Sequence, residues 1–108
     1  MIWSTRLLFW ADAFTVSPNL VLVRPKYQKD AGLLAHERVH QGQMRADGWL
    51  RFVWRYLCSR RWRACYEVEA YRVSIAHGMP LPLAAWHLKT KYWLGITHQQ
   101  AVDLLYLP

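Results

Sequence analysis

Two histidines one helical turn apart, with a glutamate directly after the first, constrain this 108-residue chain more than any other feature. The residues are His36, Glu37 and His40, in the pattern HExxH. On an α-helix, residues i and i+4 are separated by about 40° around the axis, so both imidazoles project from one face. Such a pair can bind one metal ion, and a stable site needs a further ligand from elsewhere in the chain. The motif therefore predicts a helix here and a second element packed against it.

Signals on either side of the motif predict that helix. Asp30 suits an N-cap, and the helix is expected to run to about Asp47, where Gly48 follows. More helices are expected at residues 49–59, 62–77, 83–94 and from residue 97 onward. Thr97 and Gln100 have the spacing of a capping box. Most of the chain is therefore predicted to be helical.

The segment before this helix carries short β-prone runs, at residues 7–10, 14–16 and 20–23. Ser17, Pro18 and Asn19 form a turn cluster between the last two runs, and Pro25 follows the last. The simplest structure for them is a small antiparallel hairpin. The chain is 54% hydrophobic and has no repeat or low-complexity tract. We expect one domain over residues 1–108, α+β in class, mostly helical with a small N-terminal antiparallel sheet.

The third metal ligand is expected to come from the helix at residues 62–77, which contains Glu67 and Glu69. The apolar side of this helix is one stripe, formed by Ala64, Val68, Tyr71 and Ile75. Glu67 lies about 70° from the centre of the stripe, and Glu69 about 130°. Glu67 therefore borders the packed side whereas Glu69 points to water. This favours Glu67 and leaves Glu69 as the alternative.

Two imidazoles and one carboxylate suit zinc, which keeps a position open for water when three protein ligands bind it. Glu37 is one residue from His36 and can reach that water without displacing an imidazole. In that place its carboxylate can act as general base and later protonate a leaving amine. We therefore predict that His36, His40 and Glu67 bind Zn2+ and that Glu37 is the base for hydrolysis of peptide bonds.

The motif and the downstream sequence Glu67-x-x-Ala70 together resemble the gluzincin metallopeptidases. The short chain is similar to minigluzincin-like and phage-encoded zincin domains, and the resemblance covers about residues 20–75. It implies a zincin-like fold with the ligands and the base named above. It also implies a strand beside the active-site helix, here residues 20–23, along which a peptide substrate binds as an added strand.

One position departs from the gluzincin pattern. Gluzincins often have an aspartate four residues after the ligand glutamate, whereas this chain has Tyr71 there. We expect the Tyr71 hydroxyl to serve the catalytic centre by accepting a histidine ring N–H. A third histidine of the metzincin type is excluded. The metzincin pattern HExxHxxGxxH requires glycine where this chain has Gln43 and histidine where it has Ala46. The donor to the oxyanion of the intermediate stays open among His77, His98, Tyr66, Tyr71 and Arg72.

The net charge is +7, and part of it is concentrated in a short segment rich in aromatic residues. The basic residues of that segment are Arg51, Arg55, Arg60, Arg61 and Arg63. A solvated helix face explains the pattern, and so does a surface for an anionic polymer. The alternative function is a basic helical module that binds nucleic acid or an anionic membrane, with a structural or vestigial metal site.

The cysteines and tryptophans are expected to be packing residues. The two cysteines, Cys58 and Cys65, are too few for a disulfide scaffold and lack the CxxC spacing of a zinc site with thiolate ligands. We expect both side chains to be buried. The seven tryptophans are expected to fill the core of so small a domain. Trp86 and Trp93 have the spacing of one helical face. Gln41 and Gln43 are expected at the rim of the active-site helix.

The N-terminus lacks the cleavage site of a signal peptide, and no apolar run reaches the roughly 18 residues of a membrane span. We therefore expect no transmembrane segment, and a cytoplasmic protein or one released by cell lysis. The expected substrate is a peptide or protein, with a cell-wall peptide as one candidate.

Overall fold

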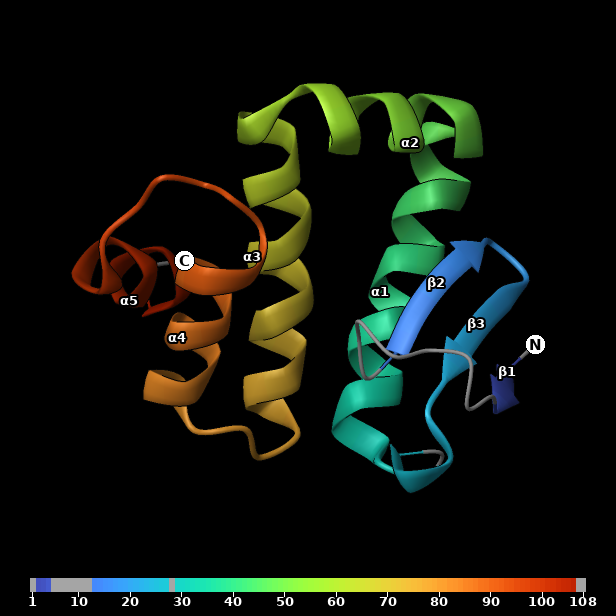
Figure 1. Cartoon of the computed structure of the whole chain (residues 1–108), viewed down its shortest axis with the longest axis horizontal. Helices are drawn as coiled ribbons and strands as arrows, with labels where there is room; N and C mark the ends of the chain where they lie inside the picture. Colours follow the sequence, from blue (N-terminus) through green and yellow to red (C-terminus); the bar gives the residue numbers. More distant parts are fainter. Residues whose placement is uncertain (1, 5–12, 28, 107–108) are drawn as a thin grey trace.

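The computed structural model describes residues 2–4, 13–27 and 29–106. Over these ranges the chain forms an α+β domain of mostly helical structure, as predicted (Figure 1). The strands and a short 3-10 helix come first, as β1 (Ile2–Ser4), β2 (Ala13–Ser17), β3 (Leu20–Val23) and Pro25–Tyr27. The helices follow, as α1 (Ala31–Asp47), α2 (Trp49–Cys58), α3 (Arg60–Ala76), α4 (Leu81–Lys91) and α5 (His98–Tyr106). None of these helices is long and apolar enough to cross a bilayer.

The sheet has the strand order β1-β3-β2. The predicted hairpin of β2 and β3 is confirmed, with antiparallel pairing and a turn near Ser17 and Asn19. The parallel pairing of β1 with β3 was not predicted, and the run predicted at residues 7–10 lies outside the described residues. Because β3 is paired on both sides, the expectation that residues 20–23 are open to an added strand is wrong. The edge strand on the α1 side of the sheet is β2.

Local capping signals set the helix boundaries. The side chain of Asp30 accepts a hydrogen bond from the Leu33 amide at 3.0 Å, which confirms the predicted start of α1. Gly48 separates α1 from α2 with a φ of 84°, a conformation that glycine adopts without steric cost. Ser59 caps α3 through the Trp62 amide, so that α3 begins at residue 60 rather than 62.

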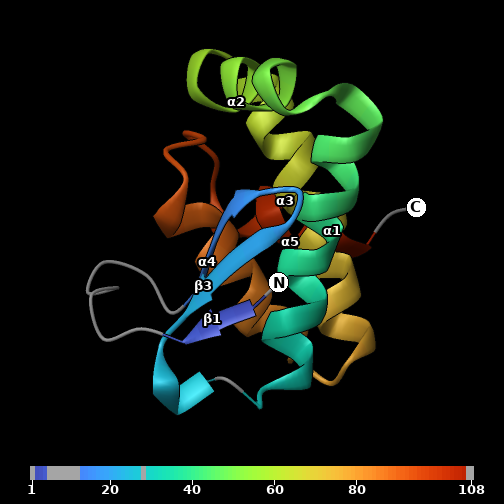
Figure 2. The same ribbon diagram turned by 90° about the vertical axis from the view of Figure 1, so that its right-hand side faces the viewer.

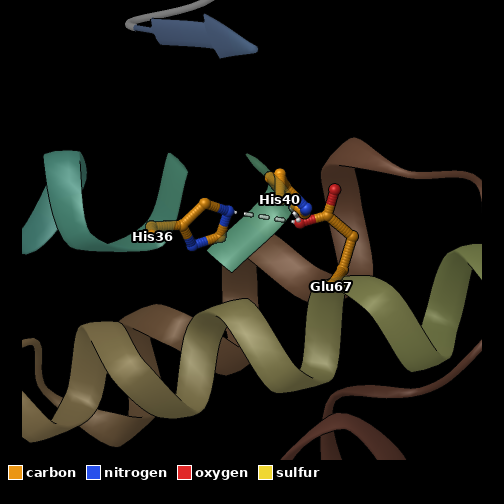
Figure 3. Close-up of side chains that lie close together, drawn as sticks. All are labelled: His36, His40 and Glu67. Atoms are coloured by element: carbon orange, nitrogen blue, oxygen red, sulfur yellow. Dashed lines mark hydrogen bonds and ion pairs between the residues drawn. The ribbon is translucent and has the colours of Figure 1, made fainter. Parts of the chain in front are cut away.

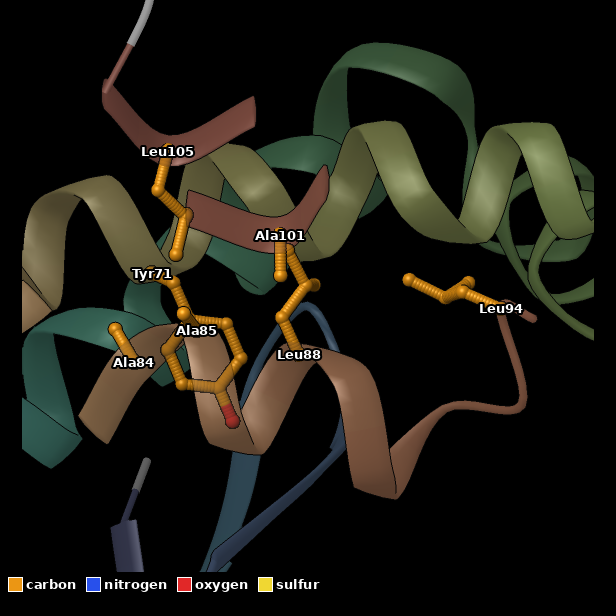
Figure 4. Packing of buried hydrophobic residues seen from close by; sticks show 7 residues of the cluster. All are labelled: Tyr71, Ala84, Ala85, Leu88, Leu94, Ala101 and Leu105. Atoms are coloured by element: carbon orange, nitrogen blue, oxygen red, sulfur yellow. The ribbon is translucent and has the colours of Figure 1, made fainter. Parts of the chain in front are cut away.

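Helix α1 lies between the sheet and α3, with β2 on one side of it and α3 on the other (Figures 1 and 2). Beyond α3, helices α4 and α5 pack together and complete the main core. Thr97 and Gln100 form the predicted capping box at the start of α5. The core contains mostly small or aliphatic side chains (Figure 4), namely Tyr71, Ala84, Ala85, Leu88, Leu94, Ala101 and Leu105. The predicted apolar stripe of α3 packs against this core.

The prediction that tryptophans fill the core is wrong for the five tryptophans from residue 49 to residue 93. These side chains are between 40% and 86% exposed, and they are Trp49, Trp54, Trp62, Trp86 and Trp93. Small residues such as Ala84, Ala85 and Ala101 let the helices approach closely, which leaves no space for indoles between them. The prediction for the cysteines is also wrong, because Cys58 and Cys65 are exposed. Cys65 lies one turn before Glu69, on the side of α3 that faces solvent.

Candidate metal centre

The three predicted ligands meet between α1 and α3. His36 and His40 project from α1 toward Glu67 of α3 (Figure 3). The Oε1 atom of Glu67 lies 3.2 Å from Nε2 of His36 and 3.1 Å from Nε2 of His40. One ligand atom from each residue lies within 4.8 Å of the others, and all three side chains are buried. A donor set of two imidazoles and one carboxylate fits a zinc ion.

Glu67 rather than Glu69 occupies this position, as the helical angles predicted. Glu67 is 2% exposed, whereas Glu69 is exposed and accepts a hydrogen bond from Nε2 of Gln43. The predicted choice between the two carboxylates therefore agrees with the geometry. The same turn of α3 brings one carboxylate to the histidines and the other to solvent.

The second nitrogen of each histidine is held by a polar side chain. Nδ1 of His40 lies 2.9 Å from Oε1 of Gln43, whose amide nitrogen donates to the carbonyl of Tyr66. The amide oxygen can only accept, so Nδ1 of His40 carries the proton. Nδ1 of His36 lies 3.1 Å from Oγ of Ser74. These contacts orient both Nε2 atoms toward Glu67, as ligands of one metal ion require.

The role expected of Tyr71 is corrected by these contacts. The ring nitrogens of His36 and His40 contact Ser74, Gln43 and Glu67. The Tyr71 ring instead packs edge-on against His36, with centroids 4.4 Å apart, and its hydroxyl lies 2.6 Å from the hydroxyl of Tyr92. The Tyr71 ring also stacks on His87 of α4, and the hydroxyl that contacts His36 belongs to Ser74, on the next turn of α3.

The other predicted oxyanion donors have contacts elsewhere. The Tyr66 hydroxyl donates to Asp47, and Arg72 donates to the carbonyl of Leu104. His77 lies at the exposed end of α3, and His98 is exposed at the start of α5. Tyr71 is thus the member of the five that contacts a histidine of the cluster.

Glu37 is buried beside the cluster and is fixed by the edge strand. The Thr15 hydroxyl of β2 donates to Oε2 of Glu37 at 2.6 Å. The Glu37 carboxylate is near enough to His40 to contribute to the pKa shift of that imidazole. The HExxH pattern predicted the position of Glu37 on α1 but not its partner, because Thr15 precedes it by 22 residues.

Tyr56 of α2 completes the surroundings of Glu67. Its hydroxyl donates to Oε2 of Glu67, the oxygen that does not face the histidines. Burial and the neighbouring Glu67 carboxylate raise the pKa of Tyr56, which keeps the hydroxyl protonated as a donor. Sequence reasoning missed this residue, and no spacing rule connects it with Glu67. Ser74 was also missed, although it lies seven residues after Glu67 and therefore on the same face of α3.

The pKa shifts of His40 and Glu67 are those of a buried pair of opposite charges. Burial disfavours charge on both groups, but each is near the other. For His40, the carboxylate of Glu67 outweighs burial and raises the pKa to about 9. For Glu67, burial is likewise outweighed by His40 and His36, which hold the pKa of the carboxyl well below its usual range. A divalent cation can replace the proton of this pair.

These shifts predict how the stability of the metal-free protein depends on pH. The raised pKa of His40 gives stabilisation that is complete below its ordinary value of 6.5 and is lost as pH rises through about 9. The depressed pKa of Glu67 gives stabilisation that is complete above 4.5 and is lost in more acidic solution. We expect the melting temperature of chelator-stripped protein to be highest between these values and to fall from pH 7 to pH 9. A melting temperature that rises from pH 7 to pH 9, measured by circular dichroism, would contradict the charged pair of His40 and Glu67.

Gln43 provides a second prediction. The substitution Gln43→Met removes the acceptor for Nδ1 of His40 while keeping a side chain of similar size, and we expect zinc affinity to fall by about 10- to 100-fold. Competition with a coloured chelator measures this affinity. The matched control is Gln41→Met, because Gln41 is also buried on α1 and has no contact with His40 among the interactions of the described residues. Equal affinities for the two variants would show that Gln43 does not orient the ligand.

Comparisons of the chain with protein-family models, with curated proteins and with solved structures found no match.

Proposed function

We propose that this protein is a zinc-dependent metallopeptidase, in which His36, His40 and Glu67 bind the metal. The observation that carries the proposal is the convergence of these three buried side chains from two helices, with a fourth buried group, Glu37, beside them. Three protein ligands leave one position of a four-coordinate zinc ion for water or substrate, which is the arrangement of catalytic rather than structural sites. A purely structural site has no need of an adjacent buried carboxylate.

The chemistry divides between the metal and the chain. Zinc supplies Lewis acidity, which polarises a carbonyl group and lowers the pKa of water. Glu37 supplies the base, which takes a proton from the attacking water and delivers it to the leaving amine. Thr15 holds one oxygen of that carboxylate and so leaves the other to accept the proton. Ser74 and Gln43 hold the imidazoles in the orientation that binding requires.

The substrate we propose is a peptide or protein in an extended conformation, with cell-wall peptides among the candidates. Support comes from β2, which is the edge strand of the described sheet on the α1 side and carries Thr15. A peptide that pairs with β2 as an added strand would form main-chain hydrogen bonds beside Glu37. Those bonds would position a scissile carbonyl without demanding particular side chains.

The proposal is tested by metal analysis and proteolysis together. Protein purified without added metal should contain about one zinc per chain and cleave a denatured protein or a peptide library. A chelator should stop cleavage, and stoichiometric zinc should restore it. Protein that binds zinc but cleaves neither these substrates nor cross-linked cell-wall peptides would overturn the peptidase assignment and favour a structural metal.

A further inference from the structure

Helix α2 is the outermost element at one end of the molecule. In both views it lies beyond the ends of α1 and α3 (Figures 1 and 2). Its inner side packs through Phe52, which is buried, and through Tyr56. Its outer side carries Leu50, Trp54 and Leu57, which are 80%, 70% and 71% exposed.

The exposed residues of α2 form one continuous stripe. At 3.6 residues per turn, Leu50, Trp54 and Leu57 lie within about 60° of one another around the helix axis. These three side chains face solvent rather than the core. Exposed apolar side chains that occur singly need no explanation, whereas a continuous stripe on a protruding helix indicates a surface with a binding partner.

Exposed basic side chains lie on α2 and just after it. Arg51 is exposed on α2, and Arg61 is exposed in the first turn of α3, which follows directly. Arg60 is exposed there too, but its guanidinium lies beside Gly95, in the segment between α4 and α5. Arg55 has a different role, because it pairs with Asp47 and stacks on the Trp62 ring. We call the stripe together with two exposed arginines the α2 face: Leu50, Trp54, Leu57, Arg51 and Arg61.

We propose that the α2 face binds the surface of an anionic lipid bilayer. Leucine and tryptophan on one side of a helix and arginine beside them are the features of helices that lie at a membrane surface. The apolar side chains would enter the boundary between headgroups and acyl chains, while the guanidinium groups bind lipid phosphates. The net charge of +7 adds attraction at longer range. This inference is independent of the proposed peptidase activity.

Other partners fit the α2 face less well. A second copy of the chain would bring the same arginines against Arg51 and Arg61, and like charges would oppose the contact. A nucleic acid would bind the arginines through its phosphates but would leave Leu50 and Leu57 without apolar contacts. An anionic bilayer satisfies both kinds of side chain at once.

The experiment is co-sedimentation of the full-length protein with vesicles at low and at moderate salt. The vesicles contain phosphatidylcholine alone or phosphatidylcholine with phosphatidylglycerol. We expect binding to the anionic vesicles at least about tenfold tighter than to the neutral ones, and weaker binding as salt is raised. The substitution Leu50→Ala/Trp54→Ala/Leu57→Ala keeps helix-forming residues and every charge, and we expect it to weaken binding by about tenfold or more.

The matched control is Trp86→Ala, which removes an exposed tryptophan from α4 and should leave vesicle binding unchanged. Circular dichroism establishes that each variant folds. The proposal is overturned if the wild-type protein does not bind anionic vesicles at low salt. It is also overturned if the triple variant binds them as tightly as wild type, which would indicate a general polyanion surface. A dimer that the triple variant abolishes, without vesicle binding, would overturn it in favour of a second copy.

Discussion

Replacing Glu37 by glutamine is expected to lower kcat/KM for peptide hydrolysis by about 10²- to 10⁴-fold while zinc stays bound. The amide has nearly the same shape as the carboxylate and can still accept the hydrogen bond from Thr15. It cannot take a proton from water at neutral pH, so the loss falls on the chemical step. Steady-state kinetics on a fluorogenic peptide, with elemental analysis of the same sample, measure both quantities.

The matched control for that prediction is Glu69→Gln. It makes the same chemical change on an exposed glutamate of α3, and it also tests the alternative third ligand. We expect its zinc content to equal that of the wild type and its activity to stay within a fewfold. Hydrolysis by Glu37→Gln at the wild-type rate would exclude Glu37 as the base. Loss of zinc from the Glu69→Gln variant would identify Glu69, rather than Glu67, as the third ligand.

Removing the third ligand is expected to have the largest effect on stability. The substitution Glu67→Gln should reduce bound zinc to well below one per chain, because a neutral amide is a poor zinc ligand. Zinc at about 1,000 times its dissociation constant stabilises the folded state by about 4 kcal/mol. For a domain of this size, about 1 kcal/mol corresponds to a shift of about 4–8 °C in melting temperature. We therefore expect the wild type with zinc to melt more than about 10 °C above its chelator-stripped form.

The Glu67→Gln variant should show almost no difference between zinc and chelator in the same thermal melts. Glu69→Gln should retain the full zinc-dependent shift and serves as the control. A zinc-dependent shift of wild-type size in Glu67→Gln would mean that the metal binds elsewhere. Zinc content and melting temperature are measured without any substrate, so this result stands apart from the peptidase assignment.

The helices and the three converging side chains were the features most accessible from the sequence. Their signals are local: Asp30 caps α1 three residues before the amide that it binds, and Thr97 and Gln100 cap α5 in the same way. The choice of Glu67 over Glu69 needed only the angle per residue of a helix and an apolar stripe. The periodicity of α3 alone was therefore enough to select which of its two carboxylates meets the histidines of α1.

The residues that hold Glu37 and Glu67 in place could not be predicted from local sequence signals. Thr15 and Tyr56 reach the site from a strand and from a helix whose packing on α1 and α3 no spacing encodes. The parallel strand β1 likewise depends on a contact between residues almost 20 positions apart. Burial was misjudged at Trp54 and Cys65, because residue type predicts burial only on average.

Helix α2 contributes to both the exposed α2 face and the surroundings of Glu67. Its outer side presents Trp54 to solvent, and on its inner side, two residues later, the hydroxyl of Tyr56 donates a hydrogen bond to an oxygen of Glu67. A small rotation or translation of this ten-residue helix would therefore displace the Tyr56 hydroxyl and its hydrogen bond to Glu67, the proposed third metal ligand. If both proposals hold, binding at the α2 face and binding of zinc are coupled through Tyr56.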